Sequence, residues 1–160
     1  GPAYIRLGKK GEPQVHTTPP PIEVGRGLVM REGSDVCLFG MGTMTATALE
    51  AAKLLEARGL TTRVVSMHTV KPLDEALLQE SFGRFRVVAV VEEHSVIGGL
   101  GGAVAEWLAA HGPRTGVLEA IGTPDAFISS AGSQQWMRER CGLTPQAVAD
   151  RVAGRFRAPR

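Results

Sequence analysis

The chain has 160 residues, 43% of them hydrophobic and 21% charged, which fits one globular domain with its own core. Its 18 basic and 16 acidic residues give a net charge of +2, too balanced to indicate a nucleic-acid-binding surface. No apolar run approaches the roughly 20 residues that cross a membrane, and no secretory signal is visible. The two distant cysteines, Cys37 and Cys141, favour a cytoplasmic protein without a disulfide framework or a zinc site.

The first part of the sequence indicates a lead-in and a linker. Ala3–Leu7 is predicted to be a short extended stretch, ended by turn residues at 8–11. Four prolines follow between residues 12 and 22, and three of them are consecutive. Consecutive prolines enforce extended geometry and donate no backbone hydrogen bonds, so residues 12–22 are predicted to form a semi-rigid linker. Residues 23–160 then form the domain that follows.

Short apolar runs predict the strands of a sheet. Ile22–Arg31 is interpreted as a strand pair or hairpin arm with a turn after it. Val87–Val91 consists almost entirely of Val and Ala, as expected where both faces of a strand are covered. The remaining predicted strands are Asp35–Gly40, Thr61–Met67 and Thr115–Ile121.

Helices are predicted between these strands. The first is capped by Thr43 or Thr45 and ends near Arg58, and the second opens at Pro72 and ends near Ser81. The third follows a glycine-rich turn, and the last begins at Thr144-Pro145 after a long loop. Strands that alternate with helices at this spacing predict an α/β fold with a parallel sheet and helices on both faces.

Candidate chemistry lies in the loops beyond the carboxyl ends of the strands, where open α/β sheets bind ligands. Glu92 and Glu93 with His94 could form an acid–base pair, and His68 could supply a second titrating group. No nucleophile stands at a matching spacing, so a hydrogen-bonded interface cluster is the preferred interpretation. A metal site is less favoured because only His68 and His94 offer nitrogen ligands there.

The turn Gly99-Leu100-Gly101-Gly102-Ala103-Val104 matches two glycines of a dinucleotide-binding GxGxxG motif. Val104 stands in the place of the third glycine, and seven residues separate the preceding strand from Gly99. The glycines therefore do not form a tight first βα turn. Close packing of the helix start against the sheet or a partner is the better explanation than nicotinamide binding.

Five stretches together resemble the C-terminal part of transketolase-family enzymes, in matching order across nearly the whole chain. The stretches are GPAYIRLGK at 1–9, GSDVCLFGMGTM at 33–44, VVSMHTVKPLD at 64–74, VVEEHSVIGGLGGAVAEWL at 90–108 and CGLTPQAV at 141–148. The most similar variant is the split form, in which the halves of the enzyme are separate polypeptides. Deoxyxylulose-phosphate synthases and 2-oxoacid dehydrogenase β subunits share the domain and are less similar. Residues 123–138 match only loosely, and this region is a candidate interface.

The resemblance implies a three-layer α/β/α Rossmann-like domain with a mostly parallel five-stranded sheet that contributes to a dimer interface. Residues 1–11 would be the tail of the pyrimidine-binding domain, and Arg6 would contact a substrate phosphate through its planar guanidinium. No catalytic residue and no metal ligand is assigned. The residues expected to form an interface or strand-end loop are His68, Lys71, Glu93, His94, Gly98, Gly99 and Gly101.

The resemblance also implies a function as part of a larger enzyme. Family members transfer a two-carbon ketol unit between sugar phosphates with thiamine diphosphate and Mg²⁺, which other domains bind. The GDG diphosphate motif is absent here, so the chain alone is expected to bind no cofactor and to be inactive. The expected partner is an N-terminal transketolase subunit or the parent chain, in a homodimer or a two-plus-two heterotetramer. A stand-alone interaction module, or the same domain of the two related enzymes, remains the alternative.

Overall fold

A computed structural model describes residues 1–8, 11–112 and 114–159 of the chain. They form a five-stranded sheet in the order β1-β3-β2-β4-β5, in which β2 to β5 run parallel and β1 pairs antiparallel with β3. The strands are β1 (Leu28–Arg31), β2 (Val36–Gly40), β3 (Thr62–Ser66), β4 (Val87–Ser95) and β5 (Val117–Thr123). The helices are α1 (Met44–Glu56), α2 (Glu75–Arg84), α3 (Leu100–His111), α4 (Gln134–Arg140) and α5 (Pro145–Arg157).

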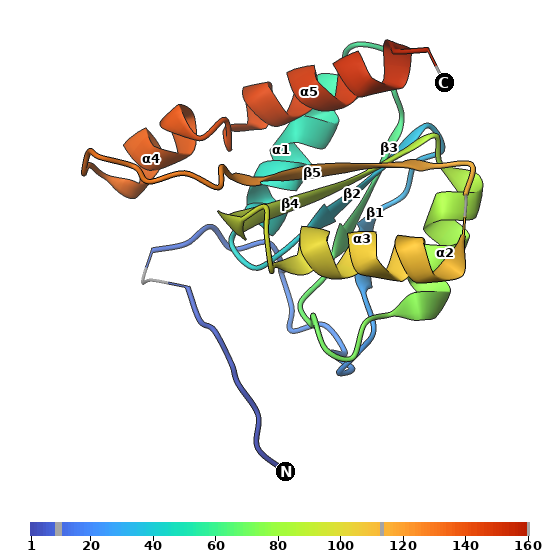
Figure 1. Ribbon diagram of the computed structural model, residues 1–160, viewed down its shortest axis with the longest axis horizontal. Coiled ribbons are helices and arrows are strands. Elements are labelled where there is room, and N and C mark those ends of the chain that lie inside the picture. Colours follow the sequence, from blue (N-terminus) through green and yellow to red (C-terminus); the bar gives the residue numbers. More distant parts are fainter. Residues whose placement is uncertain (9–10, 113, 160) are drawn as a thin grey trace.

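Two apolar cores lie on opposite faces of the sheet. Helices α1 and α5 cover one face, and α2 and α3 cover the other (Figure 1). Strands β2 and β4 supply side chains to both cores, which is why residues 36–39 and 87–91 are all apolar and buried. The predicted three-layer α/β/α architecture with a mostly parallel five-stranded sheet is confirmed.

The segment before β1 differs from its prediction. Residues 22–27 form no strand, and Leu28–Arg31 pairs with β3 rather than with a hairpin partner. The reason lies at Gly27, whose backbone N–H donates to the Asp74 carboxylate at 2.9 Å instead of to a neighbouring strand. The predicted turn residues Lys9 and Lys10 lie outside the described residues.

The helix boundaries also correct two expectations. Helix α2 begins at Glu75 rather than Pro72 and runs to Arg84, because Asp74 is the N-cap and accepts from the Leu77 N–H. Helix α4 lies within a region predicted as loop, and Ser133 caps it by accepting from the Trp136 N–H. The last helix starts as predicted, with Thr144 as its capping side chain and Pro145 in its first turn.

The described part of the chain contains no helix that is both long and apolar enough to span a membrane.

Cys37 lies fully buried in β2, where burial raises the pKa of its thiol to about 12. A thiol with so high a pKa stays protonated at neutral pH and behaves as a small core hydrophobe.

Candidate functional site: the carboxyl ends of the strands

The carboxyl ends of the parallel strands meet at one edge of the sheet. Gly40 of β2 lies in register with Ser66 of β3 and with Val91 of β4. Strand β4 continues past this point, but its pairing with β5 is irregular between Val91 and Ser95. Successive side chains of a strand point to opposite faces of the sheet. The two consecutive carboxylates of this stretch therefore lie in different surroundings, Glu92 on the face covered by α3 and Glu93 on the face covered by α1.

Glu92 is buried against the start of α3. Its two carboxylate oxygens each accept one backbone N–H, from Leu100 and from Gly101, both at 2.8 Å. A Cβ atom at Gly99 would overlap this carboxylate, and one at Gly101 would lie 3.1 Å from it. The glycine-rich turn therefore makes room for an internal carboxylate at the N-terminus of a helix, which favours negative charge.

This arrangement decides against the dinucleotide interpretation. A pyrophosphate at a helix N-terminus needs the free backbone N–H groups of the first turn. Here the carboxylate of Glu92 takes two of those donors and fills the space beside them. Gly99 and Gly101 allow close packing, as the sequence suggested, and the group that packs against them is the Glu92 carboxylate.

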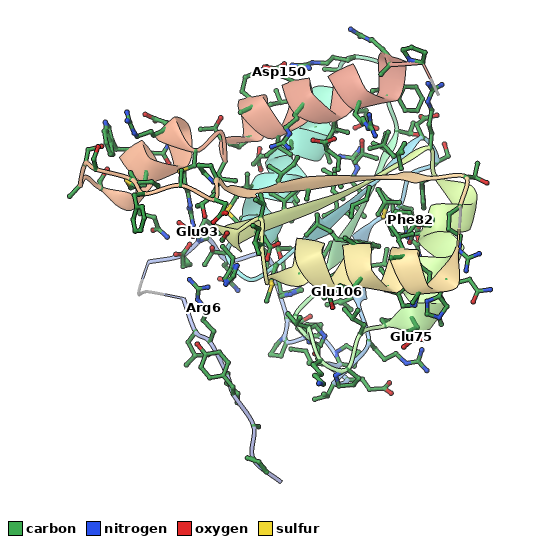
Figure 2. The ribbon with its side chains drawn as sticks, viewed as in Figure 1. Arg6, Glu75, Phe82, Glu93, Glu106 and Asp150 are labelled. Atoms are coloured by element: carbon green, nitrogen blue, oxygen red, sulfur yellow. The ribbon has the colours of Figure 1, made fainter. Side chains whose placement is uncertain are left out.

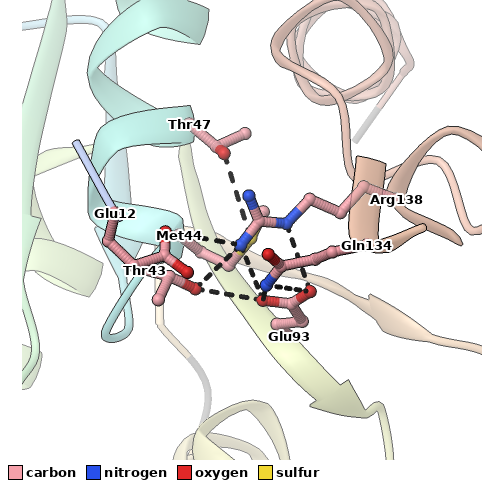
Figure 3. Close-up of polar contacts among 7 residues, drawn as sticks. All are labelled: Glu12, Thr43, Met44, Thr47, Glu93, Gln134 and Arg138. Atoms are coloured by element: carbon pink, nitrogen blue, oxygen red, sulfur yellow. Dashed lines mark hydrogen bonds and ion pairs between the residues drawn. The ribbon is translucent and has the colours of Figure 1, made fainter. Parts of the chain in front are cut away.

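Glu93 is the centre of a cluster of five polar side chains, called here the Arg138 cluster: Glu12, Thr43, Glu93, Gln134 and Arg138 (Figure 3). Arg138 donates to both Glu93 oxygens, from Nη2 at 2.7 Å and from Nε at 3.2 Å. The Gln134 amide also donates to both oxygens at 3.1 Å, and the Thr43 hydroxyl donates to one at 3.0 Å. The cluster thus joins the end of β4 to the start of α1 and to α4.

The environment of Glu93 favours its ionised form. Burial by itself raises the pKa of this carboxyl group. The hydrogen bonds from Arg138, Gln134 and Thr43, with the Arg138 charge, outweigh burial and hold the pKa below its ordinary value of 4.5. Glu93 is therefore an anchoring anion at neutral pH rather than a proton donor.

The lead-in contacts the same cluster. Gly8 lies against Thr43, so close that a Cβ atom at Gly8 would be 3.1 Å from the Thr43 methyl group. The Glu12 carboxylate lies 4.0 Å from Arg138 Nη2. Arg6 lies on this lead-in with its side chain exposed and directed toward the body of the domain (Figure 2).

His68 lies on the loop after β3, as predicted. His94 does not lie on a loop, because β4 runs to Ser95 and does not end at Val91 as predicted. His94 Nδ1 donates to the Ser95 carbonyl at 2.9 Å, and His68 Nδ1 shares a hydrogen bond of 3.0 Å with Thr69 Oγ1. The two neighbouring carboxylates bind donors of Leu100, Gly101 and the Arg138 cluster instead of pairing with His94. Within the described ranges, no three His, Cys, Asp or Glu side chains are arranged to hold a metal ion.

Two further predicted loop positions are also located. Gly98 has a φ of +79°, a left-handed conformation that favours glycine, and it turns the chain from β4 into α3. Lys71 is exposed immediately before Pro72, on the loop that follows β3.

Sequence reasoning missed most of the Arg138 cluster. Thr43 was expected to cap α1, but it occupies the N-cap position without a side-chain capping bond. Gln134 and Arg138 lie in the region predicted as loop, and Glu12 lies in the predicted linker. The Ser133-x-x-Trp136 cap was a local signal for α4, whereas contacts between residues 45 positions apart leave no local signal.

Comparison with known proteins identifies the domain. Residues 25–148 match the family model described as the transketolase C-terminal domain. The chain belongs to this family. The match begins three residues after the predicted linker ends at residue 22, and it includes both the Glu92 turn and the Glu93–Arg138 pair.

Curated relatives extend the similarity to almost the whole chain. The 1-deoxy-D-xylulose-5-phosphate synthase of Symbiobacterium thermophilum is 42% identical over 154 residues, which cover 95% of this chain and 24% of that protein. The synthase of Chlorobium luteolum is 38% identical over 161 aligned residues, which cover 99% of this chain and 25% of that protein. The chain therefore spans about a quarter of the length of these relatives.

Solved structures agree on the fold. A split-gene transketolase, determined as an inactive β4 tetramer, has a TM-score of 0.90 and 46% identity, covering 100% of this chain and 52% of that one. A transketolase variant from Pichia stipitis has a TM-score of 0.59 at 21% identity, and the match covers 81% of this chain and 18% of that one. The second likeness shows a shared fold alone.

Proposed function

We propose that the chain is the C-terminal domain of a transketolase-type enzyme that transfers two-carbon ketol units between sugar phosphates. In this proposal the domain supports assembly of the enzyme and makes no bond itself. One observation carries it: the similarity to a split-gene transketolase runs over the entire chain at 46% identity. The two carboxylates at the end of β4 bind groups of the same chain, which suits a supporting role.

The described residues offer no site that fits thiamine diphosphate. The cofactor's diphosphate needs a Mg²⁺ site or free backbone donors, and the α3 N-terminus already holds the Glu92 carboxylate. We therefore assign cofactor and Mg²⁺ binding to the remaining domains of the complete enzyme. The cofactor supplies the carbon–carbon cleavage.

The proposed organisation has residues 1–11 as the tail of the pyrimidine-binding domain, 12–22 as a linker and 23–160 as the C-terminal domain. Its support is the change in contacts near residue 25. Gly25 packs on Pro72, and Gly27 donates to the buried Asp74 carboxylate, so the chain joins the domain body there. Arg6 remains the proposed contact to a substrate phosphate.

The proposed partner is an N-terminal transketolase subunit or the parent chain, in a homodimer or a two-plus-two heterotetramer. The tetramer of the solved relative supports further assembly, since that protein is described as inactive in its β4 form. The proposed contact region is the end of β4, which carries His94, together with the loops that carry His68, Lys71 and Gly98 to Gly101. Two free cysteines agree with the proposed cytoplasmic location.

Reconstitution tests this function. The 160-residue chain would be mixed with a chain that carries the other two domains, in the presence of thiamine diphosphate and Mg²⁺. We expect ketol transfer from the mixture and none from either component alone, measured by product formation. Activity of the isolated chain would contradict the proposal, as would failure of the two chains to form a complex.

A second candidate is the C-terminal domain of a 1-deoxy-D-xylulose-5-phosphate synthase. The identity of 36–42% to eight such enzymes, over at least 95% of the chain, favours it. The same mixture separates the two candidates. Formation of 1-deoxy-D-xylulose 5-phosphate, without ketol transfer between sugar phosphates, would identify the synthase.

A further inference from the structure

Thr43 is placed for one role but performs another. It occupies the N-cap position of α1, where a threonine side chain normally accepts a backbone N–H and stabilises the helix by about 1 kcal/mol. Its hydroxyl instead donates to Glu93 and accepts from Arg138 Nη2 at 3.1 Å. The helix therefore forgoes its side-chain cap, and the hydroxyl joins a cluster that connects distant segments.

The other side of Thr43 faces the lead-in. Its methyl group is the contact of Gly8, and a side chain at Gly8 would press on both this methyl group and the stem of Glu12. The lead-in thus passes the cluster where only a glycine allows so close an approach. A displacement of Thr43 therefore acts directly on the backbone at Gly8, two residues after Arg6.

Arg138 is the cation between two carboxylates. It binds Glu93 through two hydrogen bonds and lies 4.0 Å from Glu12. Its side chain is only 16% exposed, so water screens these interactions less than at an open surface. Without it, Glu12 and Glu93 would face each other as like charges, and the lead-in would lose its electrostatic attachment.

We propose that Arg138 is a positioning residue, which holds the lead-in against Thr43 and Glu93 and thereby fixes where Arg6 presents its guanidinium. The part that concerns Arg6 rests on the proposed function, in which Arg6 contacts a substrate phosphate. The attachment of the lead-in itself does not depend on that function. Two measurements therefore separate the two parts.

The first measurement follows the lead-in in the 160-residue chain by itself. Spin labels at Leu7→Cys, on the exposed lead-in, and at Lys53→Cys, on the exposed face of α1, would report their separation by electron–electron double resonance, with Cys141→Ser to prevent other labelling. We expect one narrow distance distribution in this parent. Arg138→Met should broaden it at least about twofold, because Glu12 and Glu93 lose their shared cation.

Two matched variants control this measurement. Arg140→Gln removes a neighbouring α4 arginine that stacks on Trp136 and lies outside the Arg138 cluster, and it should leave the distribution unchanged. Gly8→Val should displace the lead-in while the Glu93–Arg138 pair remains. This variant therefore distinguishes displacement of the lead-in from a loss of structure in α4. An unchanged narrow distribution in folded Arg138→Met would overturn the proposal.

The second measurement uses the reconstituted enzyme. Arg138→Met should raise KM for a phosphorylated substrate about tenfold, the scale of one lost charge-assisted hydrogen bond, and leave kcat within a factor of about three. KM for an unphosphorylated substrate should not change. Arg6→Gln should have the same effect, and the double variant should be no worse than either single one.

These outcomes distinguish the proposal from the function on which it partly rests. If the reconstituted parent has no activity, the proposed function fails, and the distance measurement still decides whether Arg138 attaches the lead-in. If Arg138→Met broadens the distances but leaves KM for the phosphorylated substrate unchanged, the link to Arg6 is wrong. If the Arg6 and Arg138 variants had additive effects on KM for the phosphorylated substrate, that result would also contradict the link to Arg6.

Discussion

The consecutive glutamates Glu92 and Glu93 have different roles because their surroundings differ. Glu92 is 2% exposed and bonds only to backbone N–H groups of a helix start, whereas Glu93 is held by side chains from α1 and α4. The strand period accounts for their separation, because successive side chains point to opposite faces, but it does not reveal the partners of either carboxylate. Those partners lie in the glycine turn before α3 and in α4, which no spacing rule describes.

The buried carboxylate makes a specific prediction for the glycine turn. Gly99→Ala should lower the free energy of unfolding by about 3 kcal/mol, because the new methyl group would expel Glu92 and leave two buried N–H donors unpaired. Urea denaturation would measure this loss.

Gly102→Ala is the matched control in the same turn of glycines. A Cβ atom at Gly102 meets nothing within 4 Å, and alanine is favoured over glycine inside a helix by about 0.5–1 kcal/mol. This variant should be as stable as the parent or slightly more so. Equal stability of the two variants would show that Glu92 does not occupy the turn.

At the scale of elements, the pattern of apolar residues predicted the strands and helices that pack into the core. Four parallel strands and the helices α1, α2, α3 and α5 were predictable because each buries an apolar face. Helix α4 was not, because it buries no residue and shows no apolar period. Strand β1 was misjudged because the Gly27–Asp74 bond depends on a residue 47 positions away.

Helix α4 is attached to the end of β4 by charge, so its attachment should depend on pH. The pKa of folded Glu93 is lowered, so its contribution to stability is fully present above the ordinary value of 4.5 and is lost as pH falls through the lower, folded value. We expect Glu93→Gln to destabilise the domain by about 1 kcal/mol at pH 7, as for a partly exposed charged cluster.

The difference in stability between the parent and Glu93→Gln should therefore shrink below pH 4.5. Denaturation of both proteins from pH 7 to pH 3 would measure it, and groups such as Asp150, whose pKa is also lowered, cancel in the difference. A difference that stays constant over this range would mean that the Glu93 charge does not hold α4.

On the scale of the whole molecule, the chain crosses the carboxyl edge of its own sheet before it enters the fold. It touches the domain at Gly8 and Glu12, through Thr43 and Arg138, and again at Gly25 and Gly27, through Pro72 and Asp74. The prolines between these contacts keep the connection extended. The segment that the sequence indicated as a linker is thus fixed at both ends, and the second attachment is the stronger one.

This difference between the two attachments predicts how truncation affects stability. A chain that starts at Val24 loses described residues that lie outside helices and strands, and two exposed or long ion pairs, Glu12–Arg138 at 4.0 Å and Glu23–Arg26 at 3.8 Å. Its thermal midpoint should therefore fall by at most about 4 °C. A chain that starts at Leu28 also loses the Gly27 N–H and the Arg26 charge beside Asp74, which is 8% exposed.

The shorter chain should therefore lose a further 1–3 kcal/mol or so, because a buried carboxylate keeps only the Leu77 N–H that caps α2. Scanning calorimetry of the two truncated chains and the parent would compare them, and Asp74→Asn in the chain from Val24 should reproduce part of the loss. If both truncations lower the midpoint equally, the domain begins after the Asp74 contact and not at residue 23. If the chain from Val24 fails to fold, the lead-in is part of the domain, and Arg138 serves the stability of the fold before it serves the position of Arg6.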